Sequence, residues 1–251
     1  MSGQDTVTSV AQNIEQAILV FENTFDQQER QQAEQFLLSF RESKSPYTVC
    51  CHLLTHSQHD SVKMQAASIC LSSITREWPS FAPGQGLELR NAILTLLTQN
   101  LQSDVVSRQW MHVVAVLFKR AWLGEEGIQH IFITQLDQLI ESSNRSLASQ
   151  GVLFAEAVVG QCQSRRATAL GLSWEYHVRC HRDFERKVLG HVFMLLSRLL
   201  NDFMSNGEQL SPLLLAKPLL LRHTLTVVSN IMTWEFSGNN NLNNPNYHHN
   251  H

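Results

Sequence analysis

Two cysteine–histidine groups are the residues of this sequence whose chemistry could serve metal binding or nucleophilic catalysis. Cys50, Cys51 and His52 are consecutive, and His56 follows His52 by four residues, a spacing that places both histidines on one face of a helix. A zinc site would require a second ligand pair at fixed spacing, such as Cys-x-x-Cys, and the sequence has none. We therefore expect ordinary thiols and surface histidines here.

The second group, Cys180 and His181, consists of adjacent residues, which do not share a helix face. A nucleophilic cysteine needs a base within reach and a donor for the oxyanion, and the sequence indicates neither. The glycines of Gly84-Gln85-Gly86 lack the remaining glycines and the preceding strand of a phosphate-binding loop. We assign no catalytic, cofactor-binding or metal residue and expect no cofactor, so the protein is not expected to be an enzyme.

Charge and composition argue against several other classes of function. The 251 residues carry a formal net charge of −3, and no stretch forms the cluster of Lys and Arg that nucleic-acid binding usually requires. The chain begins without the charged and apolar regions of a secretory signal, and no apolar run approaches the ~20 residues that span a membrane. We expect a soluble, intracellular protein that has no nucleic-acid or membrane partner. Its five cysteines, an odd number, are expected to be reduced thiols.

Apolar residues recur at the period of an α-helix along most of the chain. One stripe consists of Val106, Trp110, Val113, Val114, Leu117 and Ala121. Similar stripes begin at Leu147, Leu189 and Leu221, and no segment shows the strict alternation of a β-strand. Because each set lies on one side of a helix, the sequence predicts an all-α protein.

Helix start signals divide these stripes into separate helices. The predicted N-terminal caps are Asp26, Ser45 (followed by Pro46), Asp60, Asp104, Asn144 and Ser211 (followed by Pro212). The predicted first helices of successive pairs lie near 26–42, 60–78, 104–123, 144–162 and 211–235. Their partners lie near 46–57, 85–101, 125–142 and 183–205, and a further helix at 6–22 precedes the first pair.

The predicted pairs recur at a nearly constant spacing. Starts at 26, 60, 104 and 144 are separated by 34, 44 and 40 residues. A period of this length with two helices is typical of HEAT repeats, whereas a compact bundle would not require units of similar length. We predict an all-α, HEAT-type α-solenoid of about five antiparallel helix pairs over 1–236.

A tail at 237–251 follows the predicted solenoid. It is rich in Asn and His and cannot bury a core, so we expect it to be disordered. His248, His249 and His251 could bind a transition metal adventitiously, but a low-complexity end is the favoured interpretation.

The segment 163–183 breaks the regular pattern. It contains the helix-breaking Gly171, and we interpret it as a long connection with a short helix near 174–181. Long loops of this kind often carry binding residues. Arg165 and Arg166 could therefore pair with an acidic partner, although solvated loop charges are expected.

Tryptophan recurs where the predicted first helices end. Ile74-Thr-Arg-Glu-Trp78 aligns with Phe118-Lys-Arg-Ala-Trp122, 44 residues later, and Trp234 ends the last helix in a similar context. Tryptophan is common among the hot spots of protein interfaces. The repetition instead favours packing at the corners between helices, so we expect all three rings to be part of the core.

Several strings carry a resemblance to a known family. They are "AEQFLLSFRESKSPYTVC" at 33–50, "QAASICLSSITREWPSF" at 65–81, "HVVAVLFKRAWL" at 112–123, and "GLSWEYHVRC" with "VFMLLSRLL" within 171–200. Together they resemble the amino-terminal part of exportins, members of the importin-β (karyopherin) superfamily. The resemblance covers about 10–236 and is expected to end after Phe236. Family members are several times longer, so the chain is expected to be an amino-terminal portion.

This resemblance implies a nuclear transport receptor that shuttles between nucleus and cytoplasm through the nuclear pore. Exportins bind protein cargo together with the GTP form of the small GTPase Ran, and they contact nucleoporins. The implied cargoes are translation initiation factor five-A and Smad-type proteins. Ran contacts in the family lie mostly on the second helices of the pairs, here near 46–57, 85–101 and 125–142. No short motif assigns individual partner-binding residues, and a HEAT scaffold that acts without Ran is the alternative.

Overall fold

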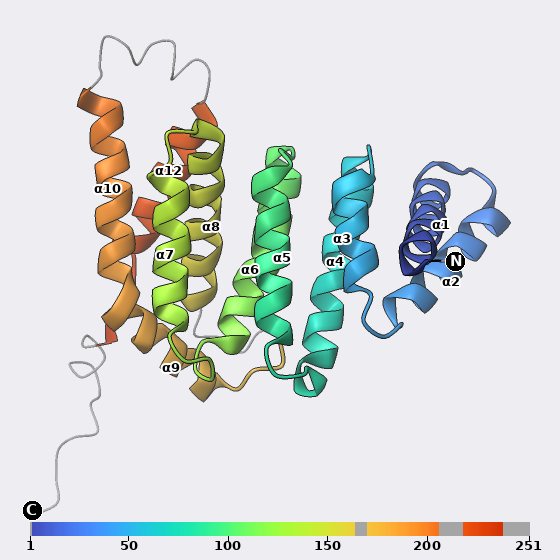
Figure 1. The fold of residues 1–251 in the computed structure, drawn as a ribbon, viewed down its shortest axis with the longest axis horizontal. Helices are drawn as coiled ribbons and strands as arrows, with labels where there is room; N and C mark the ends of the chain where they lie inside the picture. Colours follow the sequence, from blue (N-terminus) through green and yellow to red (C-terminus); the bar gives the residue numbers. More distant parts are fainter. Residues whose placement is uncertain (1, 164–169, 206–217, 238–251) are drawn as a thin grey trace, which may run out of the picture. The chain divides into compact units, whose positions relative to one another are not determined.

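The computed structural model describes residues 2–163, 170–205 and 218–237, and these residues form helices joined by turns (Figure 1). No β-strand occurs in the described part, and none of the described helices is both long and apolar enough to cross a membrane. The chain divides into two units, Met1–Ala121 and Trp122–His251. Each unit has its own set of packed helices.

The first unit consists of paired helices. They are α1 (Gly3–Asn23), α2 (Gln27–Arg41), α3 (Tyr47–His56), α4 (Asp60–Glu77), the short η1 (Trp78–Ser80), α5 (Gln85–Gln99) and α6 (Asp104–Ala121). α1 packs against α2, α3 against α4, and α5 against α6, and short turns make the members of each pair antiparallel (Figure 1). α1 and α5 also contact α3, while α2 and α6 contact α4. The pairs therefore stack with α1, α3 and α5 in a first layer and α2, α4 and α6 in a second layer.

The second unit repeats this arrangement. Its elements are α7 (Ile128–Ile140), α8 (Arg145–Gln163), α9 (Trp174–Phe184), the π-helical η2 (Glu185–Leu189), α10 (Gly190–Ser205) and α12 (Pro218–Met232). α7 packs against α8 and α10 against α12, and the two pairs are joined by the contacts of α7 with α10 and of α8 with α12. Helix pairs stacked on helix pairs confirm the predicted all-α solenoid class.

The pairs begin one helix earlier than the sequence predicted. The helix expected at 6–22, ahead of the first pair, is α1 and pairs with α2. The helices expected as second members near 46–57, 85–101 and 125–142 are α3, α5 and α7, and each is the first member of its pair. Successive helices of a repeat can be grouped into pairs in two ways, so the repeat period alone did not determine which helix is the first member of each pair.

The hydrogen bonds at the helix starts show which of the predicted N-terminal caps are correct. The side chain of Asp26 accepts hydrogen bonds from the backbone N–H of Gln28 and Glu29, and the side chain of Asn144 accepts one from Ser146, as predicted. The prediction for Ser45 was wrong. Its backbone has a left-handed φ of 49°, and its N–H donates to the Glu77 carboxylate at 2.9 Å. This tertiary hydrogen bond holds the residue away from a capping position.

Asp60 and Asp104, also predicted as caps, are instead the first residues of α4 and α6. A carboxylate in the first turn still interacts favourably with the positive end of the helix dipole. At α6 the preceding residue supplies the cap, because the Ser103 hydroxyl accepts a hydrogen bond from the N–H of Val106 at 3.4 Å. Each predicted start was therefore displaced by one residue.

The connection after α8 differs most from the prediction. The short helix begins at Trp174 as expected, but it does not end near 181 and is not separated from the next helix. α9 continues through the π-helical turn Glu185–Leu189 into α10, and the axis changes direction between α9 and α10 (Figure 1). The inserted residue of a π turn allows such a bend without breaking the helix. The first residues of the helix predicted at 211–235, the arginines at 165 and 166, and the tail from 238 lie outside the described residues.

α7 and α8 approach each other closely at a glycine. A Cβ atom on Gly151 would lie 2.7 Å from Cγ1 of Ile140 and 2.9 Å from Cβ of Leu139. Gly160, two and a half turns further along the same helix, is exposed and has no atom within 4 Å of such a position. The small residue at 151 is therefore required by the packing of the pair.

We predict opposite effects for alanine at these two glycines. Gly151→Ala should lower the free energy of unfolding by about 1–3 kcal/mol, because the added methyl group meets atoms of α7 that cannot move freely. Gly160→Ala should raise it by roughly 0.5–1 kcal/mol, because alanine favours the helix and meets nothing. Urea denaturation of both variants measures the difference, and stabilisation by Gly151→Ala would contradict the close approach.

Candidate functional site

Two of the three tryptophans predicted to pack at helix corners lie in an aromatic cluster of the second unit. Trp122 and Trp234 are 1% and 4% exposed. The ring of Phe184 lies between them, with centroid distances of 5.5 Å to Trp122 and 5.7 Å to Trp234. Phe132 lies 6.1 Å from Phe184 and 5.1 Å from Phe154. The core role predicted for these two tryptophans is confirmed.

The indole N–H of each of these tryptophans donates to a carboxylate from the α9–η2 region. Trp122 Nε1 lies 2.8 Å from Oδ2 of Asp183, and the same oxygen accepts a hydrogen bond from Gln129 at 2.7 Å. Trp234 Nε1 lies 3.1 Å from Oε2 of Glu185. A buried indole needs such an acceptor, since an unpaired donor in the core is destabilising. Two acids therefore satisfy the two indoles.

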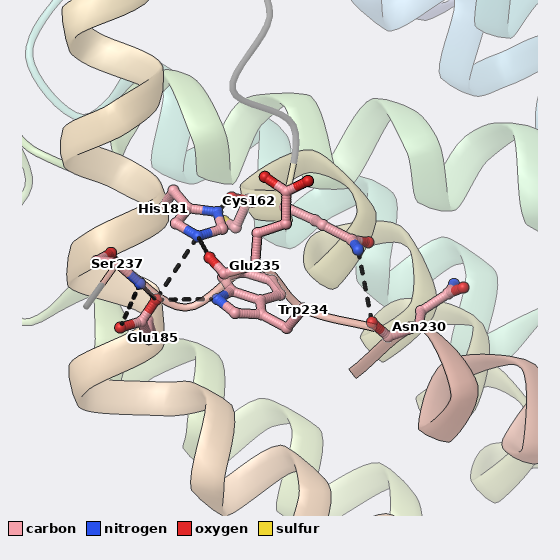
Figure 2. Close-up of polar contacts among 8 residues, drawn as sticks. Cys162, His181, Glu185, Asn230, Trp234, Glu235 and Ser237 are labelled. Carbon is pink, nitrogen blue, oxygen red and sulfur yellow. Dashed lines mark hydrogen bonds and ion pairs between the residues drawn. The ribbon is translucent and has the colours of Figure 1, made fainter. Parts of the chain in front are cut away.

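His181 joins α9 to the end of α8 and to the segment that follows α12 (Figure 2). Its ring is stacked on Trp234 with 4.3 Å between centroids. Nδ1 lies 3.2 Å from the carbonyl oxygen of Cys162, and Nε2 lies 2.8 Å from that of Glu235. Carbonyl oxygens only accept hydrogen bonds, so both contacts are satisfied when the ring carries both protons. The charge of that imidazolium is then balanced by Glu185, whose Oε2 lies 3.6 Å from Nε2.

Glu185 accepts hydrogen bonds from several donors in the same cluster (Figure 2). Besides the Trp234 indole, it accepts hydrogen bonds from the backbone N–H of Ser237 at 3.1 Å and from the Ser237 hydroxyl at 3.2 Å. Partial burial raises the pKa of Glu185, but these hydrogen bonds and the charge of His181 outweigh it, so the pKa is lower than its ordinary value. The ionised carboxylate therefore stabilises the folded state.

The cysteine and histidine groups singled out from the sequence do not form a reactive site. Burial raises the pKa of Cys51 to about 11 and that of the buried Cys50 further still, so both thiols are protonated and poorly nucleophilic at neutral pH. His52 and His56 stack on each other at 4.0 Å, and Nδ1 of His56 lies 3.0 Å from the His52 carbonyl oxygen. Cys180 is buried. Across the described ranges, no three His, Cys, Asp or Glu side chains gather as metal ligands would.

Trp78, the third predicted core tryptophan, is only half-buried. Its ring packs against Gly86, where a Cβ atom would lie 2.9 Å from the indole, and against Phe81 at a centroid distance of 5.2 Å. The predicted packing at a helix corner is therefore confirmed for this residue, although its ring, where η1 turns the chain immediately after α4, is less buried than those of Trp122 and Trp234.

The two residues before Trp78 have roles that the sequence did not indicate. Arg76 donates to the carbonyl oxygens of Arg41 and Ser43 at 3.0 and 2.9 Å, and Glu77 accepts hydrogen bonds from the Ser45 N–H and the Tyr47 hydroxyl. These contacts fix the α2–α3 connection to the end of α4. A charged pair at a helix end was the available signal, but its partners lie 30 or more residues away.

A groove of about 220 Å³ between α1, α2 and α4 is the candidate site for contact with a partner protein. It is lined by Ile18, Phe21, Glu22, Glu34, Leu37, Leu38, Arg41 and Gln65. Within α2 only Ala33 is buried, whereas Phe36 and Leu38 are 45% and 51% exposed. Apolar side chains exposed beside a groove are typical of protein interaction sites. The sequence assigned this segment to a first helix, so this surface was not predicted as partner-facing.

The lowered pKa of Glu185 predicts an acid-dependent loss of stability. A carboxylate whose pKa is depressed on folding stabilises the protein above its unfolded pKa, the ordinary value of about 4.5, and this contribution disappears as the pH falls through the folded pKa. Glu185→Gln should lower the free energy of unfolding at neutral pH by about 1.5–3 kcal/mol, as expected for hydrogen bonds to a charged group. It should also reduce the dependence of stability on pH below the unfolded pKa.

Denaturation of the full chain at a series of pH values measures the free energy of unfolding and its pH dependence. Glu175→Gln is the control. Glu175 is an exposed carboxylate on the same stretch of helix. Its replacement should leave both the stability and its pH dependence close to those of the unmodified protein. Equal pH profiles for Glu185→Gln and the unmodified chain would show that the carboxylate is not coupled to folding.

Comparison with known proteins places this fold in a family. The family model for exportin-4 matches residues 6–247, so the match extends beyond Phe236, where the resemblance was expected to end. A curated exportin-4 from Dictyostelium discoideum is 22% identical over 224 residues, an alignment that covers 83% of this chain. The chain spans about a fifth of the length of that relative, since the alignment covers 20% of it. On the extent of the family match, this chain belongs to the exportin-4 family.

Proposed function

We propose that this chain is the amino-terminal, Ran-binding part of a nuclear export receptor. The match to the exportin-4 family over 6–247 is the observation that carries this proposal. The chain binds Ran in its GTP form, takes part in carrying protein cargo out of the nucleus, and contacts nucleoporins while it shuttles between nucleus and cytoplasm. The cargo classes are translation initiation factor five-A and Smad-type proteins. The chain acts by binding rather than by catalysis.

The pairing of the helices supports a Ran-binding surface on the second layer of the first unit. Second helices of stacked pairs form one continuous layer, which can contact a folded partner over a large area. In this chain those helices are α2, α4 and α6 rather than α3 and α5, which the sequence had suggested. α2 adds exposed apolar side chains beside the groove with α1, and the apolar centres of interfaces contribute most of their binding energy.

Binding to Ran loaded with a non-hydrolysable GTP analogue, compared with Ran loaded with GDP, tests this proposal. We expect binding to the GTP form alone. Leu38→Glu should weaken it by about tenfold or more, because a charge would replace an apolar contact at the centre of the interface. Thr48→Glu on α3, an exposed position in the first layer, should leave the affinity unchanged. Biolayer interferometry with each immobilised chain, the unmodified one and the two variants, measures binding to both nucleotide forms of Ran.

The control also separates the alternatives. If Thr48→Glu weakened binding and Leu38→Glu did not, Ran would contact the first-layer helices instead. Equal binding to the two nucleotide forms, or no binding to either, would contradict the Ran proposal and favour a HEAT scaffold that acts without Ran.

A further inference from the structure

α9 and the start of η2 carry an exposed basic surface that the Ran proposal does not use. Trp174, Val178, Arg182 and Arg186 follow one another at four-residue spacing, and Arg179 lies beside this row, three residues before Arg182. The three arginines are exposed, and Trp174 is 65% exposed. We call Trp174, Arg179, Arg182 and Arg186 the α9 basic face.

Two acids of the same stretch of helix, Asp183 and Glu185, are occupied by other contacts. Asp183 accepts hydrogen bonds from Trp122 and Gln129 through one oxygen, and its other oxygen lies 2.7 Å from Nζ of Lys187. Glu185 is bound by Trp234, Ser237 and His181. These two negative charges are therefore engaged by core groups and by Lys187, while Glu175 and the arginines remain at the surface.

The three arginines are left without acidic partners. Throughout the described ranges, no ion pair joins any of their guanidinium groups to a carboxylate. Glu175 lies one turn before Arg179, but the two side chains are not paired. Unpaired arginines gathered on one helix face, in a chain whose net charge is −3, form a local positive field that attracts an acidic ligand.

Trp174 lies at one end of this face, where the helix start defines the position of its backbone. It is the first residue of α9, directly after the N-cap Ser173, whose hydroxyl accepts a hydrogen bond from the N–H of Tyr176 at 3.2 Å. Gly171, with a φ of +66°, turns the chain into this start. An exposed indole beside arginines has the composition of interface hot spots. It offers an apolar contact next to the charged ones.

We propose that the α9 basic face binds an acidic peptide segment of a partner protein. Carboxylates of the segment pair with the guanidinium groups of Arg179, Arg182 and Arg186, in the two-point geometry that arginine favours. An apolar side chain of the segment packs on the ring of Trp174. Acidic motifs are recognised in this way by arginine clusters in other binding proteins.

A peptide fits this face better than a nucleic acid does. Glu175 lies on the same side of the helix as the arginines, and its carboxylate would repel a continuous chain of phosphates. A peptide can place its carboxylates around that position. This surface shares no residue with α2, α4 and α6, so the peptide experiment tests the proposal independently of Ran binding.

Fluorescence anisotropy with a labelled peptide of Asp and Glu residues around one Phe tests the proposal. The full chain should bind this peptide, and added salt should weaken the binding because the contacts are ionic. Arg179→Glu, Arg182→Glu and Arg186→Glu together should weaken it by about tenfold or more. Trp174→Ala alone should weaken the binding of the peptide that contains Phe. It should leave unchanged the binding of a second peptide in which Ala replaces that Phe. Circular dichroism should show unchanged thermal unfolding, because all four side chains are exposed.

The matched control reverses three exposed basic residues elsewhere, Lys44, Arg198 and Arg222, each to Glu. It changes the net charge by the same amount and should retain binding of the peptide. Loss of binding in both triple variants would show attraction by total charge only and would overturn the proposal. No binding of the peptide by the unmodified chain, or tighter binding of a single-stranded oligonucleotide through the same arginines, would overturn it as well.

Discussion

The packing of the second unit depends on two carboxylates of one stretch of helix that accept hydrogen bonds in its core. Asp183 accepts a hydrogen bond from the indole N–H of Trp122, and Glu185 accepts one from that of Trp234. Both rings are almost completely buried. Without these acceptors, each buried donor would lose its hydrogen bond to water and gain none in return. The same contacts tie α9 to the start of the unit at Trp122 and to the segment after α12. These two acids face the core while the arginines beside them are exposed, so one stretch of helix supplies both the core contacts and the α9 basic face.

In the first unit, long-range hydrogen bonds of charged residues likewise stabilise the arrangement of the helices. Arg76 and Glu77, at the end of α4, hold the connection between α2 and α3 through backbone and side-chain hydrogen bonds. This connection includes Ser45, whose left-handed backbone would be unfavourable without such support. The charged residues at helix ends therefore act as links between successive helix pairs. They leave the apolar stripe of each helix free to pack against its neighbours.

The way the helices pair has a direct consequence for function. Contacts place α1 with α2, α3 with α4 and α5 with α6, so the surface formed by second helices includes α2. That helix buries one residue and exposes two large apolar ones beside a groove. A prediction that counted the pairs from the next helix assigned the Ran contacts to α3, α5 and α7. The contacts between helices, rather than the order of helices in the chain, decide which helices form the second layer that we propose as the Ran-binding surface.

The sequence by itself determined the helices and the family. Apolar stripes at a 3.6-residue period, together with caps such as Asp26 and Asn144, located most helices within a few residues, because these signals act between neighbours in the chain. The strings around Trp78 and Trp122 carried the family resemblance. Only the tertiary structure decided that Ser45 is not a cap, that α9 continues into α10, and that Trp78 is half-buried while Trp122 is not. It also decided that Asp183 and Glu185 turn inward while Arg179, Arg182 and Arg186 remain exposed. These outcomes depend on partners tens of residues away, whose positions no local pattern contains.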